Sequence, residues 1–161
     1  MKLFITRKDL YKPELVKYYL PWEEAVHMLN KERLMFNAHF YGYNLIGEDP
    51  RKKENYELTE ESKLMAKAVA TVLLNEKYAF KERKLPVVIH EGNTVFVENA
   101  IPGVEFVYEA IKQELEKHGE NVEDYFILKD PYNTDTWGEI KFLMKQSQIY
   151  KPDAIISLAF P

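Results

Sequence analysis

The sequence predicts one α/β domain spanning residues 1–161, a Rossmann-like three-layer α/β/α arrangement with a mainly parallel sheet. Apolar runs without polar alternation occur at 85–90, 122–128 and 154–160, as expected for strands buried on both faces. Segments with helical spacing separate these runs, so strand and helix alternate along the chain. No linker or low-complexity stretch divides the sequence, and its length suits one compact core.

The N-terminal half is less regular. Residues 3–6 are apolar enough for a short strand. Pro21 precedes a run at 22–34 whose apolar residues recur at i, i+3, i+4 and i+7, which predicts a helix. Residues 35–46 are aromatic and β-prone and predict a strand-like segment. The charged stretch 51–57 predicts a solvated loop.

Three helices are predicted in the C-terminal half. Thr59 is a good N-cap for the first helix, whose apolar stripe covers 64–73. Pro102 lies near the start of the second helix, and Gly119 ends it. The third helix is predicted at 136–149. Its predicted apolar face consists of Trp137, Ile140, Leu143 and Met144.

Composition excludes several classes of protein. The net charge of -4, from 26 acidic and 22 basic residues, argues against a nucleic-acid binder that relies on bulk charge. The chain has no cysteine, which excludes disulfides, thiolate nucleophiles and cysteine-ligated metals. The N-terminal apolar run is too short for a signal peptide, and no window reaches the length of a membrane span. These features predict a cytoplasmic protein without a membrane partner.

The common cofactor and catalytic motifs are absent. The sequence contains no GxxxxGK[ST] phosphate-binding loop, no GxGxxG after a strand and no GxSxG nucleophile turn. Its four histidines form no ligand pair such as HxxxH, so no metal site is predicted. The sequence therefore names no cofactor.

Polar residues follow two of the predicted strands, and loops after parallel strands gather at one edge of the sheet. His90 and Glu91 end the first strand and are the candidate catalytic residues, because both can transfer protons. The helices that follow these loops begin with free N–H groups, which favour phosphate or carboxylate. The candidate ligand-binding residues are Gly92, Asn93, Thr94, Glu105, Asp130, Asn133 and Thr134.

Each of these residues also has a structural explanation. Asn133 and Thr134 are good helix caps, and Asp130 precedes a proline in an ordinary turn sequence. His90 at a strand end fits a half-buried histidine with a satisfied hydrogen bond. Glu105 lies early in a helix, where the dipole alone favours a carboxylate.

The order of these pieces resembles the YdcF/SanA/ElyC family of bacterial α/β domains. The corresponding segments are a helix at 64–74, a strand with a glycine-containing loop at 87–93, Glu105, and the Asn133-Thr134 pair after the strand at 127–130. The resemblance implies a Rossmann-like fold. It also implies a polar pocket at the strand ends for a nucleotide-like or phosphorylated small molecule.

Two functions remain open. The first is a small-molecule-binding protein that catalyses a transfer or hydrolysis at the carboxyl ends of the strands. The second is a non-catalytic binding or regulatory module that self-associates. The run at 154–160 has no helix after it, so either the domain continues beyond this sequence or the strand lies at or near a sheet edge. A homo-oligomer would cover such an edge.

Overall fold

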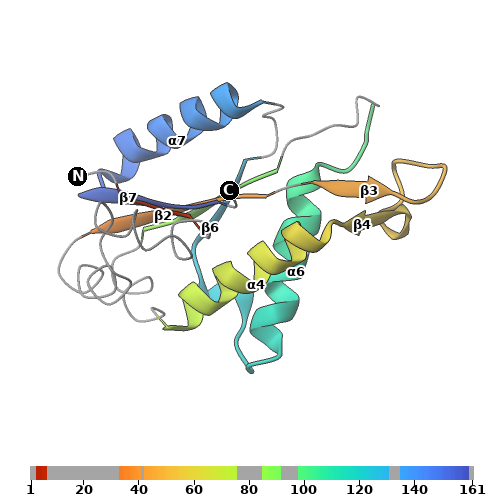
Figure 1. The fold of residues 1–161 in the computed structure, drawn as a ribbon, viewed down its shortest axis with the longest axis horizontal. Helices are drawn as coiled ribbons and strands as arrows, with labels where there is room; N and C mark the ends of the chain where they lie inside the picture. The colour runs from red at the N-terminus through yellow and green to blue at the C-terminus, as the bar shows by residue number, and fades with distance from the viewer. Residues whose placement is uncertain are drawn as a thin grey trace.

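The structure is a computed structural model with helices on both faces of a parallel sheet (Figure 1). It describes residues 3–6, 33–40, 42–75, 85–91, 98–130 and 135–159. The sheet has five strands in the order β1-β7-β2-β5-β6, and every pairing in it is parallel. The α/β class and the Rossmann-like layers predicted from the sequence are confirmed.

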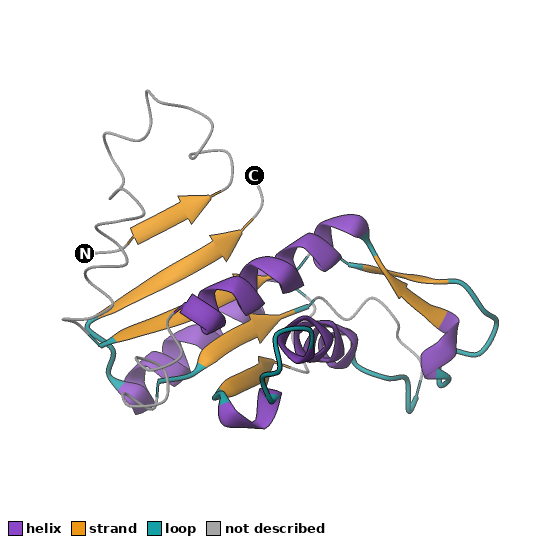
Figure 2. Ribbon diagram, turned by 90° about the horizontal axis from the view of Figure 1, so that it is seen from below, coloured by secondary structure: helices purple, strands orange, loops and turns teal. Residues whose placement is uncertain are grey.

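The five strands lie side by side and point the same way (Figure 2). They are β1 (Leu3–Thr6), β2 (Leu34–His39), β5 (Val87–His90), β6 (Ile127–Asp130) and β7 (Ala154–Ala159). All four residues of β5 are buried, which explains its uninterrupted apolar run. β7 pairs with both β1 and β2, so it is the second strand from the β1 edge.

Two helices cover one face of the sheet and a third covers the other (Figure 1). They are α4 (Glu60–Asn75) and α6 (Gly103–Glu116) on the first face, and α7 (Thr136–Tyr150) on the second. Alternate strand residues face the α4 and α6 side, where they form the hydrophobic core with the apolar stripes of these helices. The strand members of the core include Phe36, Ala38, Val87, Ile89 and Ile156, and Phe40 directly after β2 joins them.

The predicted helix boundaries have clear local causes. The Ser62 N–H donates to Thr59 Oγ1 at 3.2 Å, so Thr59 caps α4 as predicted. At the end of α6, Gly119 has a φ of 72°, which favours glycine. The Glu120 N–H then donates to the Leu115 carbonyl at 3.1 Å, which closes the helix. Helix α6 therefore begins after Pro102 and ends before Gly119.

The segment predicted as one strand at 35–46 is divided. Gly42, at a φ of 98°, separates β2 from a second strand, β3 (Tyr43–Leu45). β3 pairs antiparallel with β4 (Tyr56–Leu58), and a short 3₁₀ helix, η1 (Lys53–Asn55), precedes β4. The hairpin extends beyond the layers of the main sheet (Figures 1 and 2).

The solvated loop predicted at 51–57 is therefore partly wrong. The reason is an aromatic contact that the sequence pattern does not reveal. The Tyr56 ring stacks on Phe106 of α6, with ring centroids 4.5 Å apart, and Tyr43 lies edge-on to Tyr56 at 5.2 Å. Such aromatic pairs contribute more stability than the area they bury would give. They attach the hairpin to the start of α6.

Two further predictions are corrected or lie outside the described residues. Residues 22–32 of the first predicted helix are outside the described part of the chain, and residue 34 begins β2 instead. The strand predicted at 122–128 starts late, because the Asn121 side chain accepts from the Glu123 N–H and forms the 3₁₀ helix η2 (Val122–Asp124).

The apolar face predicted for α7 is exposed rather than buried. Trp137 is 63% exposed and Met144 is 56% exposed. Every residue of α7 is described, and the buried ones are Glu139 and Gln146, both polar. Helix α7 therefore buries polar rather than apolar side chains. In the described ranges, no helix has the length and apolar character needed to cross a membrane.

We expect Leu115→Ala to lower the free energy of unfolding by about 2–5 kcal/mol, because Leu115 is fully buried in the core and its loss leaves a cavity. The matched control is Leu64→Ala, since Leu64 also lies in a helix but is 47% exposed. Its effect should stay within about 0.5 kcal/mol. Denaturant unfolding measures both, and equal losses would contradict this assignment of the core.

Candidate functional site

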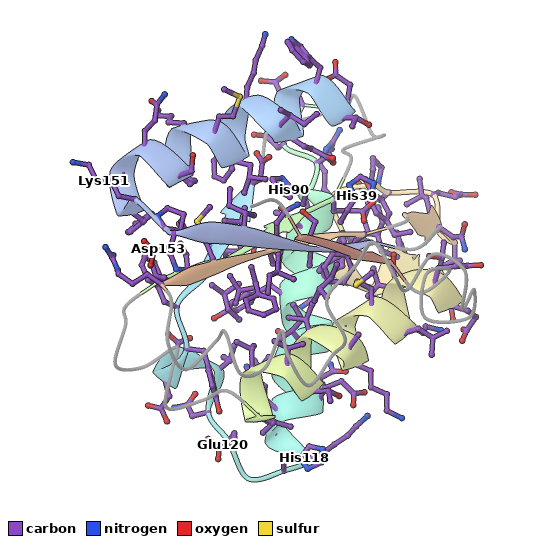
Figure 3. All side chains as sticks on the ribbon, turned by 60° about the vertical axis from the view of Figure 1, so that its left-hand side comes forward. His39, His90, His118, Glu120, Lys151 and Asp153 are labelled. Carbon is purple, nitrogen blue, oxygen red and sulfur yellow. The ribbon has the colours of Figure 1, made fainter. Side chains whose placement is uncertain are left out.

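Three adjacent strands end in ionisable side chains. β2 ends at His39, β5 at His90 and β6 at Asp130. Parallel pairing places His39 opposite His90, and His90 opposite Asp130. Alternate residues of a strand share a face, and these three lie on the face opposite the core formed with α4 and α6. Figure 3 shows His39 and His90 close together beneath α7.

His90 and Asp130 form a buried pair. His90 Nδ1 lies 2.8 Å from Asp130 Oδ2, and each side chain is at most 2% exposed. An ionised carboxylate can only accept, so Nδ1 donates its proton to Asp130. In the neutral ring the lone pair then lies on Nε2, which has no hydrogen-bond partner among the described residues. His90 is thus oriented as a general base or hydrogen-bond acceptor.

His39 is paired with a residue of α7. His39 Nδ1 lies 2.8 Å from Glu139 Oε2, and Glu139 is 7% exposed. The hydrogen bond to Glu139 raises the pKa of His39 and outweighs its burial, which acts in the opposite direction. The charges of Glu139 and Glu91 raise this pKa further. His39 therefore holds its proton more strongly than an ordinary histidine and can serve as an acid or as a cation.

Glu91 follows His90 directly in the sequence, and its carboxyl is buried. Burial raises its pKa to about 7, and Glu139 adds to the rise, whereas the Gly42 N–H and the His39 charge oppose it. The Gly42 N–H donates to Glu91 Oε2 at 3.2 Å. A Cβ on Gly103 would lie 2.8 Å from the Glu91 side chain, so the start of α6 also confines this carboxyl. Glu91 can therefore exchange a proton near neutral pH.

A cleft of about 700 Å³ lies between α7 and the sheet. Its size and mixed lining are typical of small-molecule sites. The strands contribute Asn37, His39, His90, Ile155 and Ser157. Helix α7 contributes Thr136, Glu139, Ile140, Leu143, Met144 and Ser147. His39 and His90 lie toward one end of α7, and Asp153, which also lines the cleft, lies near the other end (Figure 3).

A second hollow of about 410 Å³ lies between the hairpin and helices α4 and α6. Its lining includes Lys63, which forms ion pairs with Glu57 at 3.1 Å and with Glu60 at 2.7 Å. None of the residues predicted as site residues lines it in the described part of the chain. The cleft beneath α7 is therefore the better candidate for chemistry.

The structure brings some of the predicted site residues together. His90 and Asp130 are hydrogen-bonded, and Glu91 lies close enough to His39 to influence its pKa. Glu105 accepts from Lys129 Nζ at 2.9 Å and is not among the described residues that line the cleft. The remaining predicted ligand-binding residues lie outside the described ranges. They are Gly92, Asn93, Thr94, Asn133 and Thr134.

The N-cap of α7 is Asp135, whose carboxylate accepts from the Gly138 N–H at 2.6 Å. This cap satisfies one of the free N–H groups at the start of the helix. Thr136, the first residue of α7, lines the cleft. The start of α7 therefore lies over the same cleft as His39 and His90.

Sequence reasoning missed four cleft residues. They are His39, Glu139, Asn37 and Ser157. His39 and Asn37 lie in the aromatic segment 35–46, where the sequence marks no strand end at residue 39, and Glu139 lies early in a predicted helix, where the dipole alone favours a carboxylate. A usable signal existed in His39, because it is the last residue before a glycine-containing turn, as His90 is. Within the described ranges, no group of three histidine, aspartate or glutamate side chains is arranged to hold a metal.

Comparison with known proteins adds no assignment. A scan against models of protein families, a search of curated proteins and a search of solved structures each found no match. The function is therefore argued from the geometry of the cleft and from the chemistry of its side chains.

We expect the Glu91 carboxyl to lower stability as the pH rises. Between about pH 4.5 and about pH 7 the native carboxyl keeps a proton that the unfolded chain has released, so the free energy of unfolding falls across this window. The Glu91 contribution amounts to roughly 3 kcal/mol. Glu91→Gln should remove it, since the amide cannot ionise and can still accept from Gly42.

Denaturant unfolding at about pH 4.5 and about pH 8 measures this contribution as the difference between the wild type and Glu91→Gln. Glu48→Gln, at an exposed carboxyl, is the control and should keep the wild-type pH dependence. An unchanged pH dependence in Glu91→Gln would show that folding does not raise the pKa of Glu91.

We expect Glu139→Gln to lower the pKa of His39, because the hydrogen bond to the Glu139 carboxylate is the main cause of its elevation. Titration of the histidine ring resonances by NMR measures this pKa directly. Glu48→Gln should leave it unchanged. If the pKa of His39 stays the same in Glu139→Gln, the pairing of His39 with α7 is wrong.

Proposed function

We propose that this chain binds a nucleotide-like or phosphorylated small molecule in the cleft beneath α7 and catalyses a transfer or hydrolysis there. One observation carries the proposal: the His90–Asp130 pair is buried, and His90 Nε2 has no partner among the described residues although its ring lines the cleft. A buried polar atom without a partner destabilises a fold. Such atoms are typical of sites where a ligand or water completes the hydrogen bond.

The proposed roles follow from the pairing of each side chain. His90 acts as the general base, since Asp130 orients its ring and favours the protonated form that develops during the reaction. His39, with its raised pKa, donates a proton or neutralises developing negative charge at the same edge. Glu91 exchanges protons with this pair. The residues after β5 and β6 that the sequence identified would complete the contacts to the ligand.

The non-catalytic alternative has one observation in its favour. Trp137, Met144 and Ile149 of α7 are each more than half exposed. Large apolar side chains exposed together on one helix are typical of an interaction surface. If these residues mediate self-association, His39, His90 and Asp130 would have only a structural role.

A ligand screen tests the proposed function. Nucleosides, nucleotides, sugar phosphates and S-adenosylmethionine are tested for a rise in melting temperature, and each compound that binds is then followed by ¹H and ³¹P NMR for turnover. We expect His90→Gln to retain binding but to lower turnover by about 10²- to 10⁴-fold, the range typical of a lost general base. His118→Gln, at an exposed histidine distant from the cleft (Figure 3), should keep full activity.

Asp130→Asn provides an independent check, because it leaves His90 in place but no longer favours the Nδ1–H tautomer. Turnover should fall while circular dichroism shows a folded protein. Unchanged turnover in both variants would refute the acid–base role. If no compound binds and Trp137→Ser converts an oligomer to a monomer by light scattering, the chain is the interaction module instead.

A further inference from the structure

The cleft contains a second polar position, two residues before His39 in β2. Asn37 of β2 and Ser157 of β7 are partners in the parallel register. Asn37 Nδ2 donates to Ser157 Oγ at 3.3 Å. Asn37 Oδ1 is buried and has no hydrogen-bond partner within the described ranges. Both residues line the cleft.

A buried amide oxygen without a donor is unfavourable, because it loses its hydrogen bonds to water and gains nothing in return. Asn37 lies in the interior of the sheet, where an apolar residue would avoid this cost. A hydrogen-bond donor from a molecule in the cleft would satisfy the oxygen. The Asn37 amide nitrogen donates to Ser157, and this hydrogen bond fixes the direction in which the amide oxygen points.

The surroundings of Asn37 restrict the kind of donor. Helix α7 presents Ile140, Leu143 and Met144 to the cleft, and β7 presents Ile155. No lysine or arginine is among the described lining residues, whereas Asp153, near the end of the cleft away from His39 and His90, carries a carboxylate. An anionic group is therefore disfavoured in this part of the cleft. A neutral group with apolar faces and an N–H at its edge matches this lining.

The spacing of the two polar positions allows one ligand to contact both. Asn37 and His39 are two residues apart on one strand, a rise of about 6–7 Å. A bicyclic heteroaromatic ring can bridge this separation with its edge toward Asn37 and its substituent toward His90.

We infer that Asn37 and Ser157 form a specificity subsite for the N–H-bearing edge of a nucleobase-like ring, with Asn37 Oδ1 as the acceptor. This inference rests on the proposed function, since it identifies the part of the ligand that is distant from the reacting group. The competing explanation is structural: the Asn37–Ser157 hydrogen bond ties β2 to β7 and contacts no ligand.

Two nucleosides that differ in one donor group test the inference. Adenosine carries an exocyclic amino group, and purine riboside lacks it but is otherwise the same molecule. We expect the wild type to bind adenosine about fivefold more tightly, the value of one ordinary hydrogen bond. Isothermal titration calorimetry measures both dissociation constants.

Three variants test whether Asn37 causes the preference for adenosine. Asn37→Ala should bind the two nucleosides equally, with an affinity close to that of the wild type for purine riboside. Ser157→Ala should reduce the preference, because the amide loses its anchor. Asn44→Ala removes an exposed asparagine from the β3 strand and is the matched control; it should keep the fivefold preference.

Three results would overturn the inference. Equal binding of the two nucleosides by the wild type would show that Asn37 Oδ1 accepts no donor from the ring. A preference that survives Asn37→Ala would place its recognition elsewhere. Binding of neither nucleoside at millimolar concentration would show that the cleft takes no adenine-like ring and would overturn the inference. None of these results changes the turnover test on His90, so the proposed function stands or fails separately.

Discussion

The parallel register of β2, β5 and β6 is the constraint on which the candidate site depends. It aligns the last residues of three strands, His39, His90 and Asp130, although they are far apart in the sequence. Because alternate residues share a face, the core residues of these strands point to α4 and α6 while the polar residues point to α7. A shift of one residue in any of these strands would bury a different set of side chains and separate His39, His90 and Asp130.

The two faces of the sheet have different roles. The face toward α4 and α6 is apolar and closely packed, as a stable core requires. The face toward α7 carries polar residues and a cleft, and α7 itself buries Glu139 and Gln146 rather than large apolar side chains. Stability thus comes mainly from one face, which leaves the other available for a ligand. Natural proteins commonly violate packing rules where they function.

The start of the hairpin and the start of α6 both contact Glu91. Gly42 ends the β2 segment with a positive φ and donates its N–H to Glu91, while Gly103 leaves room for the same carboxyl at the start of α6. Burial at this position raises the pKa of Glu91 to about 7, although the hydrogen bond from the Gly42 N–H acts in the opposite direction. This arrangement places a group that titrates near neutral pH next to His39.

The sequence by itself determined the α/β class, the positions of α4, α6 and α7, the strand ending at His90 and the capping by Thr59, because these depend on local periodicity and on residues close in the chain. The tertiary structure alone decided the strand order, the division at Gly42 and the pairing of His39 with Glu139. It also decided that α7 stands over a cleft rather than over a core. Hydrophobic periodicity shows that a face is buried but not against which partner, and long-range pairings leave no mark on local sequence.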